Sequence, residues 1–267
     1  MRDEAAPVPR VRGVARRTVG GRVTPVRDLD WHGCFNVRDL GGLNTTDGHT
    51  IRRGALVRAD DLSRLTARGW SALLAHGVRT VVDLRNADAL TDLRPRPPEL
   101  STVRVALGDV ADTEFWELCR ANDLDGTPLY YRPFLDRKPE RCAAAVAAVA
   151  RAGPGGVVIH CGAGRDRTDA ASARARHGRS RGDRRRLRAE QPPAARVFWA
   201  ARGEDDQKPV IDEILRRKNT SARALLLDLL ASLDVDAYLR SGGLGDDDAA
   251  AVRARLLGRE LDPAAAR

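Results

Sequence analysis

The chain has few cysteines, and their spacing excludes two common structural uses of that residue. Only four occur in 267 residues, and no two of them form a C-x-x-C pair. This spacing argues against a disulfide framework and against a cysteine-based zinc site. The five histidines likewise show no spacing typical of metal ligands. We therefore expect no bound metal and a reducing, cytoplasmic location.

Long apolar runs are also missing. The longest one near a helical pattern, at 142–150, is too short and too rich in alanine to span a bilayer. The pair Arg16-Arg17 is not followed by the apolar segment of an export signal. We expect neither a transmembrane segment nor a secretory signal, and the sequence leaves the oligomeric state open.

Acidic residues are the scarcer charged type, and the net charge is +9. Segment 1–27 carries seven arginines against two acids, and segment 169–196 carries nine against three, which leaves the other residues with a net charge of −2. Neither segment contains an aromatic side chain that would stack on bases. We therefore expect solvated arginine-rich segments and no nucleic-acid partner. The alternative, RNA binding through these segments, predicts a steep salt dependence.

Segments with strand patterns alternate with segments of helical periodicity. A hairpin is expected over 44–57 with its turn at Asp47-Gly48, strands over 78–84, 103–107 and 157–160, and helices over 65–76, 139–152, 208–217, 221–233 and 246–257. This order predicts an α/β fold, with a mainly parallel central sheet flanked by helices and a C-terminal helical part. We expect a disordered basic segment at 1–27, one domain over 28–258 and a disordered tail at 259–267.

The most informative stretch is HCGAGRDRTD at 160–169, directly after the apolar run at 157–159. Ligands of open α/β sheets bind at the carboxyl ends of the strands, which is where this stretch is expected to lie. Five residues separate Cys161 from Arg167, and two of them are glycines. This layout is suited to hold a tetrahedral oxyanion in a cradle of backbone N–H groups against a thiolate.

Other interpretations of this stretch account for fewer of its residues. The dinucleotide fingerprint needs a third glycine where Arg167 stands, and the GK[ST] phosphate loop is absent. A cysteine after a strand is often only a small buried apolar residue, and a glycine-rich turn is often only a turn. The combination of histidine, cysteine, two glycines, arginine and threonine favours the phosphate cradle.

The stretch resembles the P-loop of the cysteine-dependent protein tyrosine phosphatase superfamily, whose motif is H-C-x5-R-[S/T]. Its G-[K/R]-D-R-T motif is similar to that of an atypical bacterial tyrosine/serine phosphatase branch. Some members of that branch also hydrolyse phosphoinositides. Three further blocks resemble that branch in the same order: FNVRDLGG at 35–42, RAD at 58–60 and VDLR at 82–85.

The resemblance implies a protein phosphatase fold, a phosphoprotein or phosphoinositide substrate, and neither metal nor organic cofactor. By it, Cys161 is the nucleophile, Arg167 the phosphate clamp and Asp166 the general acid, and the substrate-binding residues are Gly162, Ala163, Gly164, Arg165 and Thr168.

Three other aspartates are alternatives for the acid. Asp83 either donates the proton or only orients Arg85 or Arg38. Asp109 and Asp112 are expected in a loop before a helix, from which they could reach the site. Loop solvation and helix capping are the favoured interpretation of both.

Segment 169–196 departs from the family pattern. The helix after the P-loop should be largely apolar. Between Asp169 and Arg186, however, the sequence has no apolar side chain larger than that of alanine. A pair of compensating frameshifts in a GC-rich gene and a diverged, disordered insert both explain this, and translation of the DNA in the other frames distinguishes them. Because the support of the cradle is altered, a catalytically impaired phosphate-binding relative is the alternative function.

Overall fold

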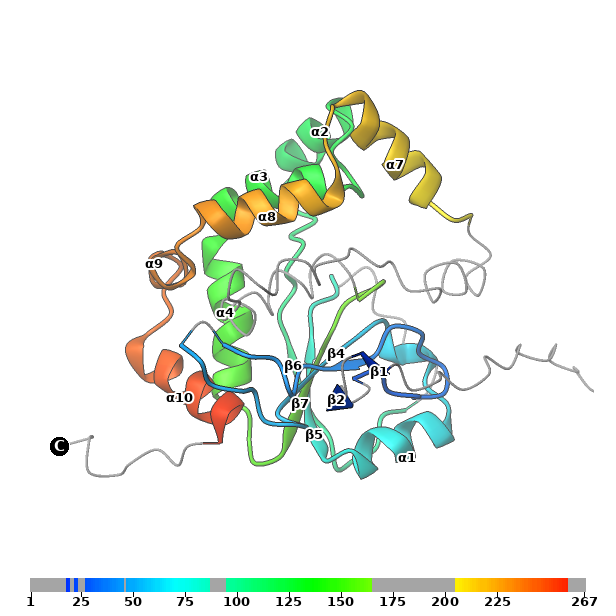
Figure 1. Cartoon of the computed structure of the whole chain (residues 1–267), viewed down its shortest axis with the longest axis vertical. Helices are drawn as coiled ribbons and strands as arrows, with labels where there is room; N and C mark the ends of the chain where they lie inside the picture. Colours follow the sequence, from blue (N-terminus) through cyan, green and yellow to red (C-terminus); the bar gives the residue numbers. More distant parts are fainter. Residues whose placement is uncertain are drawn as a thin grey trace, which may run out of the picture.

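The computed structural model describes residues 18–19, 22–23, 27–45, 47–86, 95–164 and 205–258. Its centre is a five-stranded sheet in the order β3-β4-β7-β5-β6 (Figure 1). The strands are β3 (Arg38–Asp39), β4 (Leu56–Ala59), β7 (Gly156–His160), β5 (Val78–Asp83) and β6 (Ser101–Arg104). Only the β3–β4 pair is antiparallel. The expected α/β class with a mainly parallel sheet is confirmed.

The central strands are buried on both faces, as the near-continuous apolar runs in their sequences predict. Alternate side chains of β7 enter two different cores, because successive residues of a strand face opposite sides of the sheet. Val158 packs in the core beneath helix α1, whereas Val157 and Ile159 pack in the larger core beneath helix α4.

The two faces of the sheet are covered by helices from different parts of the chain. Helix α1 (Ala67–Ala75) covers one face, and α4 (Pro139–Ala150) covers the other (Figure 1). Thr66 caps the N-terminus of α1 by accepting a hydrogen bond from Gly69 N–H. Gly77 follows its end with a φ of +89°, a conformation that glycine adopts without strain.

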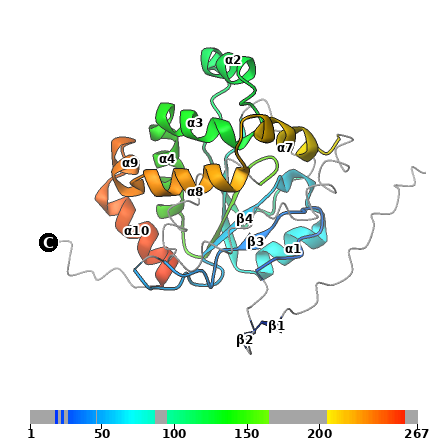
Figure 2. The same cartoon turned by 45° about the horizontal axis from the view of Figure 1, so that its top comes forward.

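The short helix η1 (Leu62–Arg64) lies on the α1 side, where Leu62 packs in the same core as α1. The remaining helices follow β6 or the cysteine-containing segment after β7. They are α2 (Thr113–Ala121), η3 (Pro128–Tyr130), α3 (Tyr131–Arg137), α7 (Lys208–Arg217), α8 (Ala222–Ser232), α9 (Val235–Ser241) and α10 (Asp246–Leu257). Figure 2 shows α8 alongside α3, where Arg132 of α3 donates to Ser232 of α8. The helices α9 and α10 pack against α4.

Several element predictions are confirmed with small shifts at their ends. The helices expected over 65–76, 139–152, 208–217, 221–233 and 246–257 are α1, α4, α7, α8 and α10, and the strands over 78–84 and 157–160 are β5 and β7. The third strand, β6, lies earlier than the predicted 103–107. A helix was expected after the loop that contains Asp109 and Asp112, without bounds, and α2 lies there. The helices α3 and α9 were not predicted.

The predicted hairpin over 44–57 is wrong in its second half. The turn at Asp47-Gly48 is present, and Asn44 bridges Thr50 in antiparallel fashion. Val57, however, belongs to β4, which pairs with β3 and β7 instead of with residue 44. The apolar run in β4 is buried in the centre of the sheet and is better satisfied there than in a surface hairpin.

Two short strands, β1 (Thr18–Val19) and β2 (Arg22–Val23), pair within the segment expected to be disordered. The rest of 1–26, the Arg-rich segment 169–196 and the tail 259–267 lie outside the described residues. Within the described part of the chain, no helix combines the length and the apolar character needed to cross a membrane.

Candidate active site

Three parallel strands end together at one edge of the sheet, and Cys161 lies at the centre of that edge. It directly follows β7, whose last residue His160 is in register with Ala59 of β4 and with Asp83 of β5. The Cys161 side chain is 3% exposed and forms no disulfide. The polar residues that follow β4 and β5 therefore flank the cysteine on both sides.

The backbone after Cys161, which we call the cysteine loop (161–164), is held by side chains of the β3–β4 region. Asn36 Nδ2 donates to the carbonyl oxygens of Ala163 and Gly164, at 3.2 Å each. Arg58, a buried residue of β4, also donates from Nη2 to the Gly164 carbonyl. Two side chains from one side of the sheet thus fix two successive loop carbonyls.

A third carbonyl of the loop is fixed by backbone. Asp61 N–H donates to the Gly162 carbonyl at 2.9 Å. Asp61 is itself fixed, since its carboxylate caps η1 through Ser63 N–H and accepts from Arg85 Nη1 at 2.9 Å. The loop following β7 is therefore joined to the segments that follow β4 and β5.

These contacts orient the N–H groups of the loop. In a trans peptide the C=O and N–H point in opposite directions, and no described peptide bond is cis. Because the carbonyls of Gly162 and Ala163 face the β3–β4 side, the N–H groups of Ala163 and Gly164 face away from it. Among the described residues, no carbonyl accepts a hydrogen bond from these two groups. Successive N–H groups that point to the same side and have no carbonyl acceptor form an anion-binding concavity.

Gly164 meets two demands that only glycine satisfies. Its φ is +63°, in the left-handed region. A Cβ at this position would lie 2.6 Å from the Ala59 carbonyl oxygen and 2.7 Å from Asp60 N. The cysteine loop can therefore lie against the end of β4 only because residue 164 has no side chain.

Asp83, the alternative general acid, is fully buried and surrounded by basic groups. Its carboxylate accepts from Arg85 Nη2 at 2.8 Å and from Arg96 Nη2 at 3.0 Å, and His160 Nε2 lies 3.4 Å from its Oδ1. Burial alone would raise the pKa of Asp83, but the contacts with His160 and Arg85 outweigh it and hold the pKa well below its usual range. This geometry favours the orienting role, directed at Arg85 and His160. Arg38 pairs with Asp28 instead.

Asp60 has the opposite electrostatic environment. Its carboxylate is 1% exposed and accepts from the N–H groups of Phe35 and Asn36. Burial raises its pKa to about 6, although the backbone hydrogen bonds act in the other direction. Burial and the charges of Asp60 and Asp61 also raise the pKa of the nearby Cys34 thiol. Cys34 is consequently protonated at neutral pH and a poor nucleophile.

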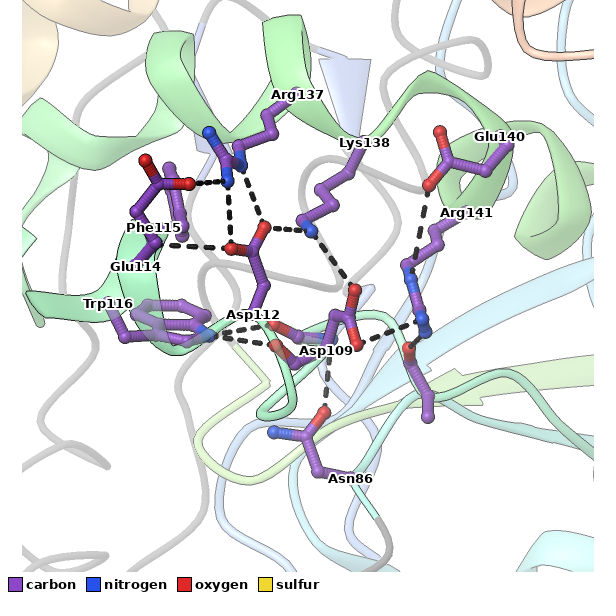
Figure 3. A network of polar contacts seen from close by, with 12 residues as sticks. Asn86, Asp109, Asp112, Glu114, Phe115, Trp116, Arg137, Lys138, Glu140 and Arg141 are labelled. Atoms are coloured by element: carbon purple, nitrogen blue, oxygen red, sulfur yellow. Dashed lines mark hydrogen bonds and ion pairs between the residues drawn. The ribbon is translucent and has the colours of Figure 1, made fainter. Parts of the chain in front are cut away.

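Asp109 and Asp112 belong to an ion-pair network on the loop after β6 (Figure 3). The buried Lys138 contacts both carboxylates, at 3.0 Å for Asp109, and Arg141 also pairs with Asp109 at 3.0 Å. Asp112 caps α2, and hydrogen bonds from Arg137 and Lys138 lower its pKa. The contacts of Asp112 thus support its favoured interpretation as a helix cap.

The structure places part of the predicted site. Cys161, Gly162, Ala163 and Gly164 form one loop at the sheet edge, whereas Arg165, Asp166, Arg167 and Thr168 lie outside the described residues. The roles of Asn36, Arg58, Asp60 and Asp61 were not predicted, although the blocks at 35–42 and 58–60 contain three of these residues. In the described part of the chain, no cluster of His, Cys, Asp and Glu has the arrangement to hold a metal ion.

Comparison with known proteins places the chain in a family. No curated protein matches it. The model of the tyrosine phosphatase family matches residues 29–258, which include the sheet, the cysteine loop and the C-terminal helices. Because this match spans most of the chain, the protein belongs to the tyrosine phosphatase family.

Proposed function

We propose that this chain hydrolyses phosphate monoesters through a covalent phosphate on Cys161. The observation that carries the proposal is the position of Cys161 at the start of a loop whose carbonyls are fixed from outside. The N–H groups of Ala163 and Gly164 are thereby left to bind an oxyanion. The family to which the chain belongs agrees with this chemistry.

In the first step, the Cys161 thiolate attacks phosphorus and the bond to the ester oxygen breaks. The leaving oxygen takes a proton from Asp166, and Arg167 binds two phosphate oxygens side by side. These two roles, and those of Arg165 and Thr168 in substrate binding, rest on the resemblance of the loop. Asp83 is less suited as the acid, because its pKa is lowered and it is ionised at neutral pH.

In the second step, water attacks the phosphorus of the cysteinyl phosphate. The sulfur leaves as thiolate, assisted by the Thr168 hydroxyl, and Asp166 accepts the proton of the water. The products are inorganic phosphate and the original enzyme. The proposed substrates are phosphotyrosine, phosphoserine and phosphoinositide headgroups, met in the cytoplasm.

A second candidate is a catalytically impaired relative that binds phosphate groups without turnover. The observation that favours it is the sequence of 169–196, where the family expects an apolar helix. This segment has nine arginines, and no apolar side chain larger than alanine occurs between Asp169 and Arg186. Both candidates bind an oxyanion at the cysteine loop, and only the enzyme turns over.

The test is hydrolysis of p-nitrophenyl phosphate with EDTA present, by the full chain and by Cys161→Ser. We expect metal-independent turnover that the substitution reduces by at least about a thousandfold, because the nucleophile is lost. A folded protein that binds inorganic phosphate without turnover would favour the second candidate. Turnover that survives in Cys161→Ser would exclude the proposed nucleophile.

A further inference from the structure

The strand register aligns three residues across the edge of the sheet. Strand β3 pairs antiparallel with β4, with Arg38 opposite Arg58. Continuing this register places Asn36 opposite Asp60, just beyond the end of β4. The β4–β7 register, in which Ala59 is opposite His160, places Asp60 beside Cys161 in the same way. The fold thus sets Asn36, Asp60 and Cys161 in one row.

Asp60 fixes the backbone that carries Asn36. Its two carboxylate oxygens accept from Phe35 N–H at 2.9 and 3.1 Å, and Oδ1 accepts from Asn36 N–H at 3.0 Å. The carboxylate forms no ion pair with a basic side chain of the described residues. Its partners are backbone N–H groups and the Cys34 thiol, without a cation. Burying a carboxylate in this way is costly, so its presence here indicates a use beyond packing.

The Asn36 side chain continues the row to the cysteine loop. Carbonyl oxygens only accept hydrogen bonds, so the two that face this amide, from Ala163 and Gly164, require its nitrogen and not its oxygen. One side chain therefore binds the carbonyls of two successive peptide groups. The first of these peptide groups carries the N–H of Gly164.

We propose that Asn36 and Asp60 are positioning residues for the cysteine loop. Asp60 holds the backbone of Asn36, and the Asn36 amide holds the loop peptides so that their N–H groups face the oxyanion and the Cys161 sulfur. This inference rests on the proposed function, and it adds two residues that touch neither substrate nor the reacting atoms. Without the Asn36 amide, the Ala163 carbonyl loses its donor and the Gly164 carbonyl keeps only Arg58. The loop peptides are then held less firmly, and both the thiolate and the bound oxyanion lose oriented donors.

The first experiment compares Asn36→Ala with Asn122→Ala. Asn122 also donates its amide to a backbone carbonyl, that of Leu118 at 2.8 Å, but it caps α2 on the surface. We expect Asn36→Ala to lower kcat for p-nitrophenyl phosphate and to weaken inorganic phosphate binding, each about tenfold to hundredfold. Asn122→Ala should leave both within about twofold. Equal behaviour of the two folded variants would overturn the proposal.

The second readout is independent of turnover. The rate at which iodoacetate alkylates Cys161 at neutral pH, followed by mass spectrometry, reports the reactivity of its sulfur. Burial raises the pKa values of the other three thiols, Cys34, Cys119 and Cys142, so they react little at neutral pH. We expect the alkylation rate of Cys161 to fall about tenfold in Asn36→Ala, since the sulfur loses aligned donors. An unchanged rate contradicts the proposal.

A double-mutant cycle tests whether Asp60 acts through Asn36. If it does, adding Asp60→Ala to Asn36→Ala weakens phosphate binding no further. If instead the two losses in phosphate binding add, Asp60 does not act through Asn36. Should Asp60→Ala not fold, Asp60→Asn, which keeps one acceptor, serves in its place with the same expectation.

Failure of the two proposals is distinguishable. If the full chain does not hydrolyse p-nitrophenyl phosphate, the proposed function fails for this chain. The phosphate-binding loss and the Cys161 alkylation rate of Asn36→Ala still decide the positioning role. If turnover is present and neither readout responds to Asn36→Ala, the positioning role alone fails.

Discussion

At the residue scale, the cysteine loop depends on a glycine that no other residue can replace. Gly164 combines a positive φ with a backbone contact that a Cβ would bring to 2.6 Å from the Ala59 carbonyl oxygen. Residues that adopt such a conformation at an active site do so because the surrounding structure enforces it. The shape of the loop is thus determined by the end of β4 as well as by its own sequence.

Gly164→Ala should therefore impair the site more than the same substitution at a glycine that has a positive φ but no close backbone contact. We expect a loss of about 2–3 kcal/mol in the free energy of unfolding, together with weakened phosphate binding, because the loop must move away from β4. The matched control is Gly48→Ala, where φ is +83° and nothing lies within 4 Å of the added Cβ. It should cost about 1 kcal/mol and leave phosphate binding intact. Denaturant unfolding and phosphate titration of both variants check this, and equal losses would refute the contact.

The raised pKa of Asp60 makes the stability of the fold depend on pH. The folded-state pKa is about 6 and the ordinary value is 3.8, so the folded chain binds the proton more tightly than the unfolded chain. This contribution is fully present below about pH 4 and is lost as pH rises through about 6. Asp60→Asn removes it. Relative to that variant, the wild type should lose on the order of 2–3 kcal/mol between pH 4 and pH 7. Unfolding curves that stay parallel across this range would show that Asp60 has an ordinary pKa in the fold.

The contacts of Asn36 could not be read from the sequence, although the motif that contains it was visible. Asn36 and the loop carbonyls it binds are 127 and 128 positions apart. They meet only because β3 pairs antiparallel with β4 and β7 inserts between β4 and β5. Cys161 was predictable because its position depends on the local sequence of one strand and the loop that follows it.

At the element scale, ion pairs connect the junction between α3 and α4 to the loop after β6. Lys138 is buried between Asp109 and Asp112, and no other basic side chain of the described residues contacts both carboxylates. Asn86, which follows β5, accepts from Gly108 N–H and holds the same loop from the other side (Figure 3). The network therefore fixes the loop that follows the edge strand.

Lys138→Met should destabilise the fold by about 3 kcal/mol, because it leaves two carboxylates facing each other without their shared cation. The control is Arg216→Met on α7, where an exposed arginine pairs with Glu213. Exposed pairs contribute little, so the expected loss there is under about 1 kcal/mol. Thermal unfolding of both variants at low and moderate salt measures the difference. A small loss at Lys138 would show that the network is not needed to hold the loop.

The elements that the sequence predicted are those with strong local signals. Helix α1 has Thr66 before it and Gly77 after it, and β5 and β7 are apolar runs. Strand β6 was misplaced because all four of its residues are exposed, so its sequence shows no alternation. The short helix α9 was missed although Asp234 caps it, since a single cap without a longer periodic run is a weak signal. For the same reason α2 was expected only as a helix of unstated length after Asp112.

At the scale of the whole molecule, the sheet separates two cores and brings the described residues of the candidate site together at one edge. The C-terminal part is attached to this framework through α4 and the turn that follows it. In that turn, the carbonyls of Ala152, Gly153 and Gly155 accept hydrogen bonds from Arg255 of α10. Arg151, at the end of α4, pairs with Asp248 of α10 at 2.6 Å. The family match reaches residue 258, just after α10, and so includes this attachment.

The central claim is that phosphate passes through Cys161. Its most direct test is to mix the full chain with p-nitrophenyl phosphate, quench with denaturant within one turnover, and determine the mass of the peptide that contains Cys161. The account predicts a gain of one phosphoryl group on Cys161, which is absent without substrate and absent from Cys161→Ala. Turnover with an unmodified Cys161 peptide, or with the phosphoryl group on another residue, would contradict it.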